Sequence, residues 1–522
     1  METKSWLRAM RRCFNGTRKR RLLWLYGLAS VASLVTFVAF WCTSVFRDAI
    51  LSNLELRNGT PSFLLWQRPP VGLVFRVHVF NYTNLREFES GHADKLRVQE
   101  VGPLVYRETL NRVNPRLHEN GTITYQEKRS FEWISGVSED QVVVVPNVLL
   151  MSTLAYSRNL PFALGIGIAI LLSSLHAKPF LELPVGELLW GYEDKLFNTM
   201  KPLASFRHHV PFEKFGLLAF RNGVNDDRIT VYTGMNDLRN IGLIERVNGM
   251  RDRKIWGDER CDAVYGSDGS MFPPHWIDQP RDTELRVYAK DVCRQLPFRY
   301  DRRDSSNGIP TFRYNLPTDI FSTNDENSCY CSKESADSAT RRCPPMGTFN
   351  VSACKFGAPI MMSYPHFYSA DKSLFEDIDG LNPVRKHSES YIHLHQTLGV
   401  TLAARIKMQM NVEVRKASPI PFLDRLKDGA ILPLIWTDSE VEELPESLQR
   451  VLYRGHYLVN AIEAGFQWCS LVGVVLSFGA LVAVLNKEKR GKLDGKLDGK
   501  LDGKLDSLGD HRSVVRTEVA AT

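Results

Sequence analysis

The sequence contains none of the short motifs that mark a catalytic nucleophile, a phosphate-binding loop or a catalytic zinc site. A G-x-S-x-G elbow, a P-loop, a dinucleotide-binding glycine motif and H-E-x-x-H are all missing from the 522 residues. These absences predict a protein that is not an enzyme, with no catalytic residues, no cofactor and no metal site.

The central part of the chain also lacks a surplus of positive charge. The formal net charge is +7, but residues 1–21 hold eight basic residues against one acidic, and residues 486–522 hold nine against seven. The segment between them is therefore weakly acidic. Basic residues that flank apolar runs orient membrane spans, and their confinement to the ends argues against a nucleic-acid partner.

Two long runs lack charged residues altogether. They are Leu22–Phe46, with 25 residues, and Ala464–Leu485, with 22. About 20 apolar residues suffice for a helix to cross a bilayer. We expect both runs to be transmembrane helices, with residues 1–21 as a basic cytosolic tail and both termini in the cytosol. Residues 47–463 then form one extracellular or lumenal domain. The first run is interpreted as an uncleaved anchor, because no small-residue cleavage site follows it.

A third uncharged run, Leu160–Leu175, has only 16 residues. It is shorter than a typical span, and Pro161, Gly165 and Gly167 weaken a continuous helix. A third crossing would also place the cysteines and the glycosylation acceptors in different compartments. Two interpretations remain. The run is either a core helix or an exposed apolar surface that contacts lipid or a protein partner.

Six of the nine cysteines lie in the predicted outer domain: Cys261, Cys293, Cys329, Cys331, Cys343 and Cys354. An even number in an oxidising compartment indicates disulfides, although spacing alone leaves fifteen pairings. Cys329 and Cys331 flank a single tyrosine and are expected to bond to other partners. A zinc site built on this C-x-C pair is the alternative.

Other modification sites follow from the predicted topology. Acceptors for N-glycosylation in the outer domain are Asn58, Asn81, Asn120 and Asn350. Cys13 lies on the cytosolic side near the membrane and is a candidate for palmitoylation. Cys42 and Cys469 lie at similar depths in the two spans, where we expect free thiols, with a bond between them as the alternative.

The outer domain shows both strand and helix patterns. Apolar residues alternate over Val71–Val79 and, for longer, over Val400–Val414. The longer pattern predicts a large antiparallel sheet or barrel with one dry and one wet face, whose apolar side lies in the barrel core or along a tunnel. Helical patterns occupy Val148–Leu172 and Val185–Asn198. The predicted fold class is α+β.

Six pieces of sequence resemble the class B scavenger receptors, the family of the fatty-acid translocase, the high-density-lipoprotein receptor and the lysosomal integral membrane protein. The pieces occur in family order between the two spans: VGPLVYR (101–107), ELLWGY (187–192), SMFPP (270–274), CYC (329–331), PHF (365–367) and IDGLNP (378–383). These pieces identify the family well but do not distinguish its members. We expect an invertebrate-like member.

The resemblance implies a large antiparallel β-barrel with a lipid tunnel and an apical helical bundle at about residues 146–198. It implies the disulfides Cys261–Cys329, Cys293–Cys354 and Cys331–Cys343. It also favours the exposed interpretation of Leu160–Leu175. The candidate apical ligand-binding residues are Arg158, Phe162, Leu164, Ile166, Ile168, Ile170, Leu171, His176 and Lys178.

The implied function is that of a cell-surface receptor that binds lipids, lipoproteins or other hydrophobic ligands at the apex and passes lipid through the tunnel. Fatty-acid-binding members use an apical lysine, whereas this apex is mostly aliphatic, which favours neutral lipids, sterols, carotenoids or lipoprotein particles. The alternatives are a sorting receptor that holds a lumenal protein at the apex, and a recognition receptor for dead cells, microbes or hydrophobic odorants. A homo-oligomer is compatible with each of them.

The C-terminal tail and the histidines give weaker signals. Residues 486–522 contain four Gly-Lys-Leu-Asp repeats, which predict disorder, and no tyrosine or Leu-Leu pair. The plasma membrane is therefore favoured over an endosomal or lysosomal membrane. His393 and His395 are interpreted as a surface pair rather than a metal site. His176 and residues 207–209 are interpreted as solvated polar groups, with pH sensing as the alternative.

Overall fold

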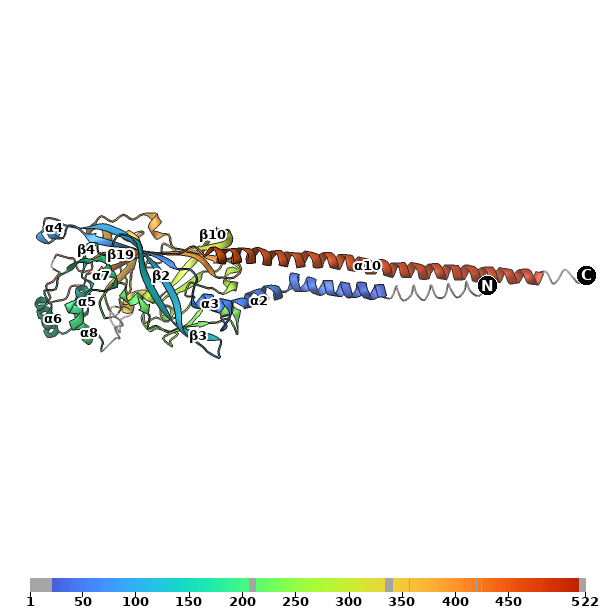
Figure 1. Cartoon of the computed structure of the whole chain (residues 1–522), viewed down its shortest axis with the longest axis horizontal. Helices are drawn as coiled ribbons and strands as arrows, with labels where there is room; N and C mark the ends of the chain where they lie inside the picture. The colour runs from blue at the N-terminus through green and yellow to red at the C-terminus, as the bar shows by residue number, and fades with distance from the viewer. Residues whose placement is uncertain are drawn as a thin grey trace, which may run out of the picture. The chain divides into compact units, whose positions relative to one another are not determined.

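The computed structural model describes residues 21–158, 160–205, 213–333, 341–355, 357–418, 420–423 and 425–515. The chain divides into two compact units. Residues 51–453 form the first, here called the barrel unit, and residues 1–50 with 454–522 form the second, here called the terminal unit. Figure 1 shows the chain from its N-terminus in blue to its C-terminus in red.

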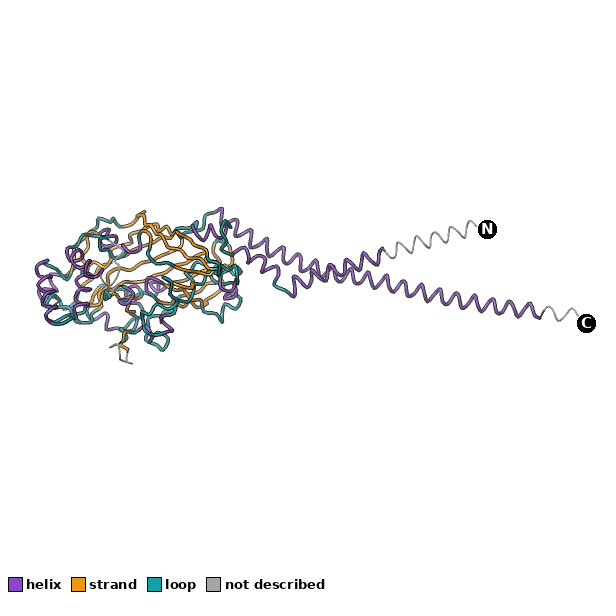
Figure 2. Tube along the Cα trace, turned by 90° about the horizontal axis from the view of Figure 1, so that it is seen from below, coloured by secondary structure: helices purple, strands orange, loops and turns teal. Residues whose placement is uncertain are grey.

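Strands make up the body of the barrel unit, as Figure 2 shows in orange. They are β1 (Leu73–Tyr82), β2 (Leu96–Leu117), β3 (Thr122–Gly136), β4 (Val142–Pro146), β5 (Phe180–Pro184), β6 (Gly223–Val224), β7 (Ile229–Tyr232), β8 (Ile244–Val247), β9 (Leu285–Ala289), β10 (Arg294–Ser306), β11 (Ile309–Asn315), β12 (Ser332–Lys333), β13 (Arg341–Arg342), β14 (Thr348–Asn350), β15 (Ile360–Ser363), β16 (Ile378–Asp379), β17 (Tyr391–His395), β18 (Thr401–Glu413) and β19 (Ile431–Val441).

The main sheet has the order β8-β7-β3-β2-β1-β19-β18-β17-β11-β10-β9 and is antiparallel along this path. One short segment connects its two edge strands. Ser267 forms a bridge with Leu243, beside β8, and a second bridge with Val287 in β9. The backbone N–H of Ile244 also donates to Gly266 O at 2.8 Å. The sheet is thereby nearly closed into a barrel, as the resemblance implied.

The two predicted long strands are present as β1 and β18. In β1, Phe75, Val77 and Val79 are fully buried, as their alternation predicts. The prediction of one dry and one wet face is wrong for β18, because Lys407, Gln409 and Asn411 on its polar face are buried too.

Hydrogen bonds satisfy the polar face of β18. Gln409 Oε1 accepts from the backbone N–H of His366 at 2.6 Å, and the Gln409 amide donates to Asn411 Oδ1 at 2.7 Å. The Asn411 amide donates in turn to Met361 O and Ser363 Oγ, both at 3.1 Å. Buried amides need such partners, and strand β15 with the turn after it supplies them.

The barrel unit contains three disulfides, and their pairing is the one that the resemblance implied. They join Cys261 to Cys329, Cys293 to Cys354 and Cys331 to Cys343.

Helices gather mainly at one end of the barrel unit, where α5, α6 and α8 lie together in Figure 1. The helices are α2 (Val45–Leu51), α3 (Pro61–Gln67), α4 (Leu85–Ser90), α5 (Val148–Ser157), α6 (Phe162–Ser174), α7 (Val185–Trp190), α8 (Lys195–Ser205), α9 (Glu259–Asp262) and α10 (Glu446–Val515). Because α5–α7 fall within the predicted apical region and α8 begins in it, we call α5–α8 the apical helices.

Among the residues that the structure describes, the terminal unit contains two helices long and apolar enough to cross a membrane. The first spans Arg21–Cys42, and the second belongs to α10. The last turn of the first helix, Val38–Cys42, is π-helical. Here the Trp41 indole donates to Gln467 O at 3.0 Å, and the Gln467 amide donates to Phe40 O at 3.1 Å. Cys42 and Cys469 are free and exposed.

The C-terminal tail differs from the predicted disorder. Helix α10 continues through the Gly-Lys-Leu-Asp repeats to Val515. The 70 residues of the helix contain no proline, so every residue has the backbone N–H that a continuous helix needs.

The barrel closure gives a test at Gly266. Its φ is +115°, and a Cβ atom there would lie 2.5 Å from Arg286 O. We expect Gly266→Ala to destabilise the protein by more than the roughly 1–3 kcal/mol of backbone strain alone, because the contact opens the closure. Gly223→Ala is the matched control, since φ is +95° there and the space is open. Thermal unfolding of the full-length protein measures the difference, and equal losses would contradict the closure argument.

Candidate ligand-binding cavity and apical helices

A cavity of about 710 Å³ lies inside the barrel. Alternate residues of two neighbouring central strands form much of its wall: Leu402, Ala404, Ile406, Met408 and Met410 from β18, and Ile435, Thr437, Ser439 and Val441 from β19. Residues two apart on a strand face the same side. The apolar face of β18 therefore lines an internal space rather than packing into a filled core.

One part of the cavity wall comes from segments next in sequence to the two apolar spans. Leu54, Leu65 and Trp66 follow the first span, and Leu448 and Leu452, from the first turns of α10, precede the second. Leu448 and Leu452 are four residues apart and so lie on the same side of the helix. All of these residues belong to the barrel unit.

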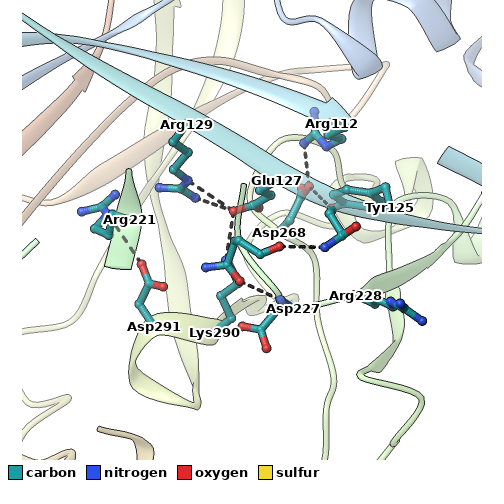
Figure 3. A network of polar contacts seen from close by, with 12 residues as sticks. Arg112, Tyr125, Glu127, Arg129, Arg221, Asp227, Arg228, Asp268, Lys290 and Asp291 are labelled. Carbon is teal, nitrogen blue, oxygen red and sulfur yellow. Dashed lines mark hydrogen bonds and ion pairs between the residues drawn. The ribbon is translucent and has the colours of Figure 1, made fainter. Parts of the chain in front are cut away.

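Another part of the wall is charged, as Figure 3 shows. Arg129, from β3, lies 2.9 Å from Glu108 of β2 and 2.9 Å from Glu127 of its own strand. The Lys290 ammonium lies 3.2 Å from Glu127 on its other side. Each of these two carboxylates thus has a cation within contact distance.

A second ion pair lies on the same wall. The Arg112 guanidinium donates to Asp268 Oδ2 at 2.7 Å and to Ser270 Oγ at 3.1 Å. It also lies over the rings of Trp66 and Tyr125, at 4.9 and 5.5 Å from their centres. The arginine is almost fully buried, so this packing and pairing replace the water it loses.

The cations keep the buried carboxylates ionised. Burial by itself would raise the pKa of Asp268, but Arg112 and the hydrogen bonds from Ser270 outweigh it and hold the pKa below its ordinary value. Burial likewise opposes ionisation of Glu127, whose pKa Arg129 and Lys290 lower. The wall is therefore a charged surface at neutral pH.

The apical helices form the second feature of the site. Helix α5 is almost entirely buried, and the Asn147 side chain caps its start by accepting from Leu150 N at 3.1 Å. The Asn147 amide also donates to Lys178 O at 3.0 Å, which ties the start of α5 to the chain after α6. Helix α5 is thus a fixed base for α6.

Helix α6 is apolar on both of its sides. Leu172 is fully buried, and Ile168 and Ala169 pack against the core. The opposite side is exposed, with exposed fractions of 66% for Phe162, 56% for Leu164 and 65% for Ile170. A contiguous exposed apolar face of this kind is typical of a binding surface, whereas single exposed apolar residues are normal on any protein.

Comparison with known families matches residues 25–485 to the CD36 family. The chain belongs to the CD36 family. This match covers the whole barrel unit, the second apolar run and all but the first three residues of the first.

Proteins similar to the chain include scavenger receptor class B member 1 and lysosome membrane protein 2. The chain is 28% identical over 480 residues to scavenger receptor class B member 1 of Sus scrofa, covering 89% of this chain and 91% of that protein. It is 32% identical over 441 residues to lysosome membrane protein 2 of Homo sapiens, covering 81% and 87%. The corresponding match to scavenger receptor class B member 1 of Rattus norvegicus is 29% over 415 residues, covering 78% of each chain. Membership in this family supports a receptor role.

The predicted apical ligand-binding residues do not all share one surface in this CD36-family protein. Phe162, Leu164, Ile166 and Ile170 are exposed on α6, whereas Ile168 and Leu171 are partly buried. Arg158 is engaged with Asp428 at 3.3 Å. His176 and Lys178 are exposed after the helix. Ligand binding at these residues stays a prediction.

The sequence reasoning missed the charged wall of the cavity. Glu108 and Arg112 continue the inward alternation of Tyr106 and Leu110 in β2, and Glu127 and Arg129 follow Tyr125 in β3. The available signal was a charge at a position that period-two alternation assigns to the buried face. Charges at such positions indicate paired groups inside the fold.

The predicted histidine surface pair is wrong, because both side chains are buried. His395 Nδ1 accepts from the backbone N–H groups of Thr397 and Leu398, each at 3.2 Å. His393 lies 3.9 Å from Asp304. Burial in the sheet follows from β17 being an interior strand, paired on both sides. No group of three or more His, Cys, Asp or Glu side chains among the described residues could hold a metal ion.

The predicted modification sites differ in their surroundings. Asn58 and Asn120 are exposed, whereas Asn81 and Asn350 are partly buried. Asn81 Oδ1 accepts from Val144 N at 2.8 Å, and Asn350 Oδ1 accepts from Ser352 N at 2.8 Å. Cys13 and residues 207–209 lie outside the described residues. Glycosylation and palmitoylation stay predictions.

The charged wall gives a test at Asp268. Asp268→Asn leaves the buried Arg112 without a carboxylate, and we expect a loss of about 3–5 kcal/mol in the free energy of unfolding. Asp237→Asn, which disrupts an ion pair with the exposed Arg239, is the control and should have no measurable effect.

The pH dependence follows from the lowered pKa of Asp268. The stabilisation is complete above the unfolded carboxyl pKa of about 3.9 and is lost as the pH falls toward the lower folded pKa. The deficit of Asp268→Asn in thermal unfolding should therefore be the same at pH 7 and pH 5. A deficit that already disappears at pH 5 would contradict the charged state assigned to Asp268.

Proposed function

We propose that this protein is a cell-surface lipid receptor that binds lipids or lipoprotein particles at its apical helices and passes lipid through the barrel to the membrane. The observation that carries the proposal is the apolar cavity inside the barrel. A filled core would need no such space, and ligand sites for small apolar molecules are concave, mostly apolar and largely preformed.

The energetics favour a passive path. Burying a methylene group from water gains about 0.8 kcal/mol, but a chain that moves from a lipid particle into an apolar cavity leaves one apolar environment for another. The transfer is then nearly neutral in free energy and needs no nucleotide hydrolysis. Concentration differences between particle and membrane set the direction.

The proposed path requires movement between the apical helices and the cavity. Among the described residues, none from α5–α8 lines the cavity. A row of aromatic rings lies between helix α7 and Arg221, which lines the cavity and stacks on Phe75 and Phe131. Phe75 lies 5.4 Å from Phe131, and Phe131 lies 4.7 Å from Trp190 in α7, between ring centres. Lipid that enters from the apex has to displace part of this row.

The second part of the proposal concerns the exposed face of α6. Phe162, Leu164 and Ile170 present aliphatic and aromatic groups without a charge on the helix. Such a face suits contact with a lipid particle or with a hydrophobic patch on a protein. The absence of tyrosine and of a Leu-Leu pair from residues 486–522 supports the plasma membrane as the site of action.

The cavity is tested by filling it. Ala404 lines the cavity, whereas Ala403 is the next residue of β18 and points to the opposite face. We expect Ala404→Phe to weaken binding of a labelled sterol and a labelled fatty acid by about tenfold or more, equivalent to about 1.4 kcal/mol, because the ring occupies their space. Ala403→Phe is the matched control. Equal binding by both variants would contradict the assignment of the cavity as the lipid-binding site.

The apical surface is tested by adding charge to it. We expect Leu164→Asp with Ile170→Asp to reduce uptake of lipid from labelled lipoprotein particles severalfold at matched surface levels, because both side chains are exposed on α6 and the protein still folds. Val224→Asp with Met250→Asp, at exposed apolar positions outside the apical helices, is the control. Unchanged uptake by the α6 variant would exclude the apical role.

A sorting receptor is the second candidate, and the exposed face of α6 favours it equally. In that case a lumenal protein binds the apical helices and the cavity is not used. Binding of that protein would then be lost in the Leu164→Asp, Ile170→Asp variant and kept in Ala404→Phe, whereas a lipid receptor loses uptake in both.

A further inference from the structure

Lys355 stands apart from the other charged groups on the cavity wall. It follows Cys354, whose disulfide with Cys293 anchors the backbone at this point. Its ammonium lies 3.9 Å from the centre of the Phe220 ring, and both residues line the cavity. In the part of the chain that the structure describes, no carboxylate lies within 4.0 Å of Lys355 Nζ, unlike the cations Arg112 and Arg129.

Arg221 is a second cation with unused bonding capacity. Its contacts with Glu108 and Asp291 are 3.6 and 3.9 Å long, beyond hydrogen-bond distance. Its buried Nε has no hydrogen-bond partner. The guanidinium lies over Phe75 and Phe131, at 5.1 and 5.8 Å from the ring centres. It therefore presents donors to the cavity without a strong acceptor among the described residues.

The neighbouring carboxylates do not accept hydrogen bonds from Lys355 or Arg221. Glu127 is held by Arg129 and Lys290, and Asp268 by Arg112. Asp291 is attracted by Lys290, Arg221 and Lys355 together, and these cations keep its pKa below the ordinary value despite burial.

Asp227 adds a further attraction for Lys355, but its carboxylate already accepts from the Asn248 amide at 2.7 Å. The groups that line the cavity include four cations and four carboxylates, and Lys290 and Asp227 beside them add one of each. The charges balance in number, but among the described residues neither Lys355 nor Arg221 has a carboxylate within hydrogen-bond distance.

We propose that Lys355 and Arg221 form a headgroup subsite that selects single-chain amphiphiles carrying one oxyanion, such as an alkyl carboxylate or an alkyl phosphate. The subsite rests on the proposed lipid-binding function of the cavity and names the residues that read the headgroup. The oxyanion accepts from the ammonium and the guanidinium, and the alkyl tail lies along Leu402, Ile406 and Met410. Selectivity for a charged head is thereby placed inside the barrel and not on the aliphatic surface of α6.

The environment strengthens such a contact. A charge-assisted hydrogen bond in a cavity with mostly apolar walls is screened less than one in water. Burial lowers the pKa of Lys355 to about 8, an effect that the attraction of Asp291 only partly offsets. The lysine is therefore charged at neutral pH, and an anion beside it removes an unfavourable burial of charge.

The test measures binding of four probes to the purified full-length protein: palmitate, hexadecyl phosphate, hexadecanol and inorganic phosphate. We expect Lys355→Gln to weaken palmitate and hexadecyl phosphate by roughly ten- to a hundredfold while hexadecanol is unchanged. Lys355→Arg should retain most of the affinity, because it keeps the charge.

The pH profile separates charge from packing. Because the pKa of Lys355 is about 8, preference for the anionic probes should be present below pH 8 and decline as the pH rises above it. Lys355→Arg should hold its preference to pH 10, because a guanidinium stays protonated there. A profile shared by both proteins would overturn the role of the Lys355 charge.

The remaining outcomes also decide for or against the subsite. Unchanged palmitate binding in Lys355→Gln overturns the subsite, as does an equal loss of hexadecanol, which would mean a structural defect. Competition by inorganic phosphate as strong as that by hexadecyl phosphate would identify a free oxyanion site and overturn the selection of amphiphiles. Binding of hexadecanol without preference for the anions leaves the lipid cavity standing and overturns this inference alone, whereas binding of no amphiphile overturns both.

Discussion

The barrel depends on keeping ionised groups inside an apolar shell. A carboxylate or a guanidinium moved out of water loses several kcal/mol of hydration, which only a well-placed partner restores. Glu127 between Arg129 and Lys290 and Asp268 against Arg112 meet this requirement. Because Arg129 of β3 also contacts Glu108 of β2, and Arg112 of β2 contacts Asp268, the charges also fix how β2, β3 and the segment before β9 lie against one another.

The same constraint explains why the cavity has two kinds of wall. Strands β18 and β19 face it with aliphatic side chains, which need no partner and leave space where opposing chains do not meet. The charged wall cannot be rearranged as freely, since moving one member leaves another unpaired. Shape changes that admit a ligand are therefore easiest on the β18–β19 side and among the aromatic rings near Trp190.

Local patterns in the sequence predicted much of the fold and little of the charged wall. The alternation over Val400–Val414 predicted β18 because neighbouring residues alone decide it. The pairing of Arg112 with Asp268 joins residues 156 positions apart, and no local pattern specifies it. The polar face of β18 was expected to be wet for the same reason: the segment that covers it, β15 and the following turn, lies some 50 residues earlier in the chain. The exposed side of α6 followed from the family resemblance rather than from its composition, which fits a core helix equally well.

The position of the disulfides has a consequence for covalent connectivity. All three fall between Cys261 and Cys354, so no cross-link ties residues 51–260 to the rest of the barrel unit. If the backbone were cut once near α6, only non-covalent contacts would hold the two pieces together, chiefly the pairing of β1 with β19 and ion pairs such as Arg112 with Asp268. Apart from the backbone itself, residues 51–260 thus keep their place by non-covalent contacts, whereas residues 261–354 are cross-linked among themselves.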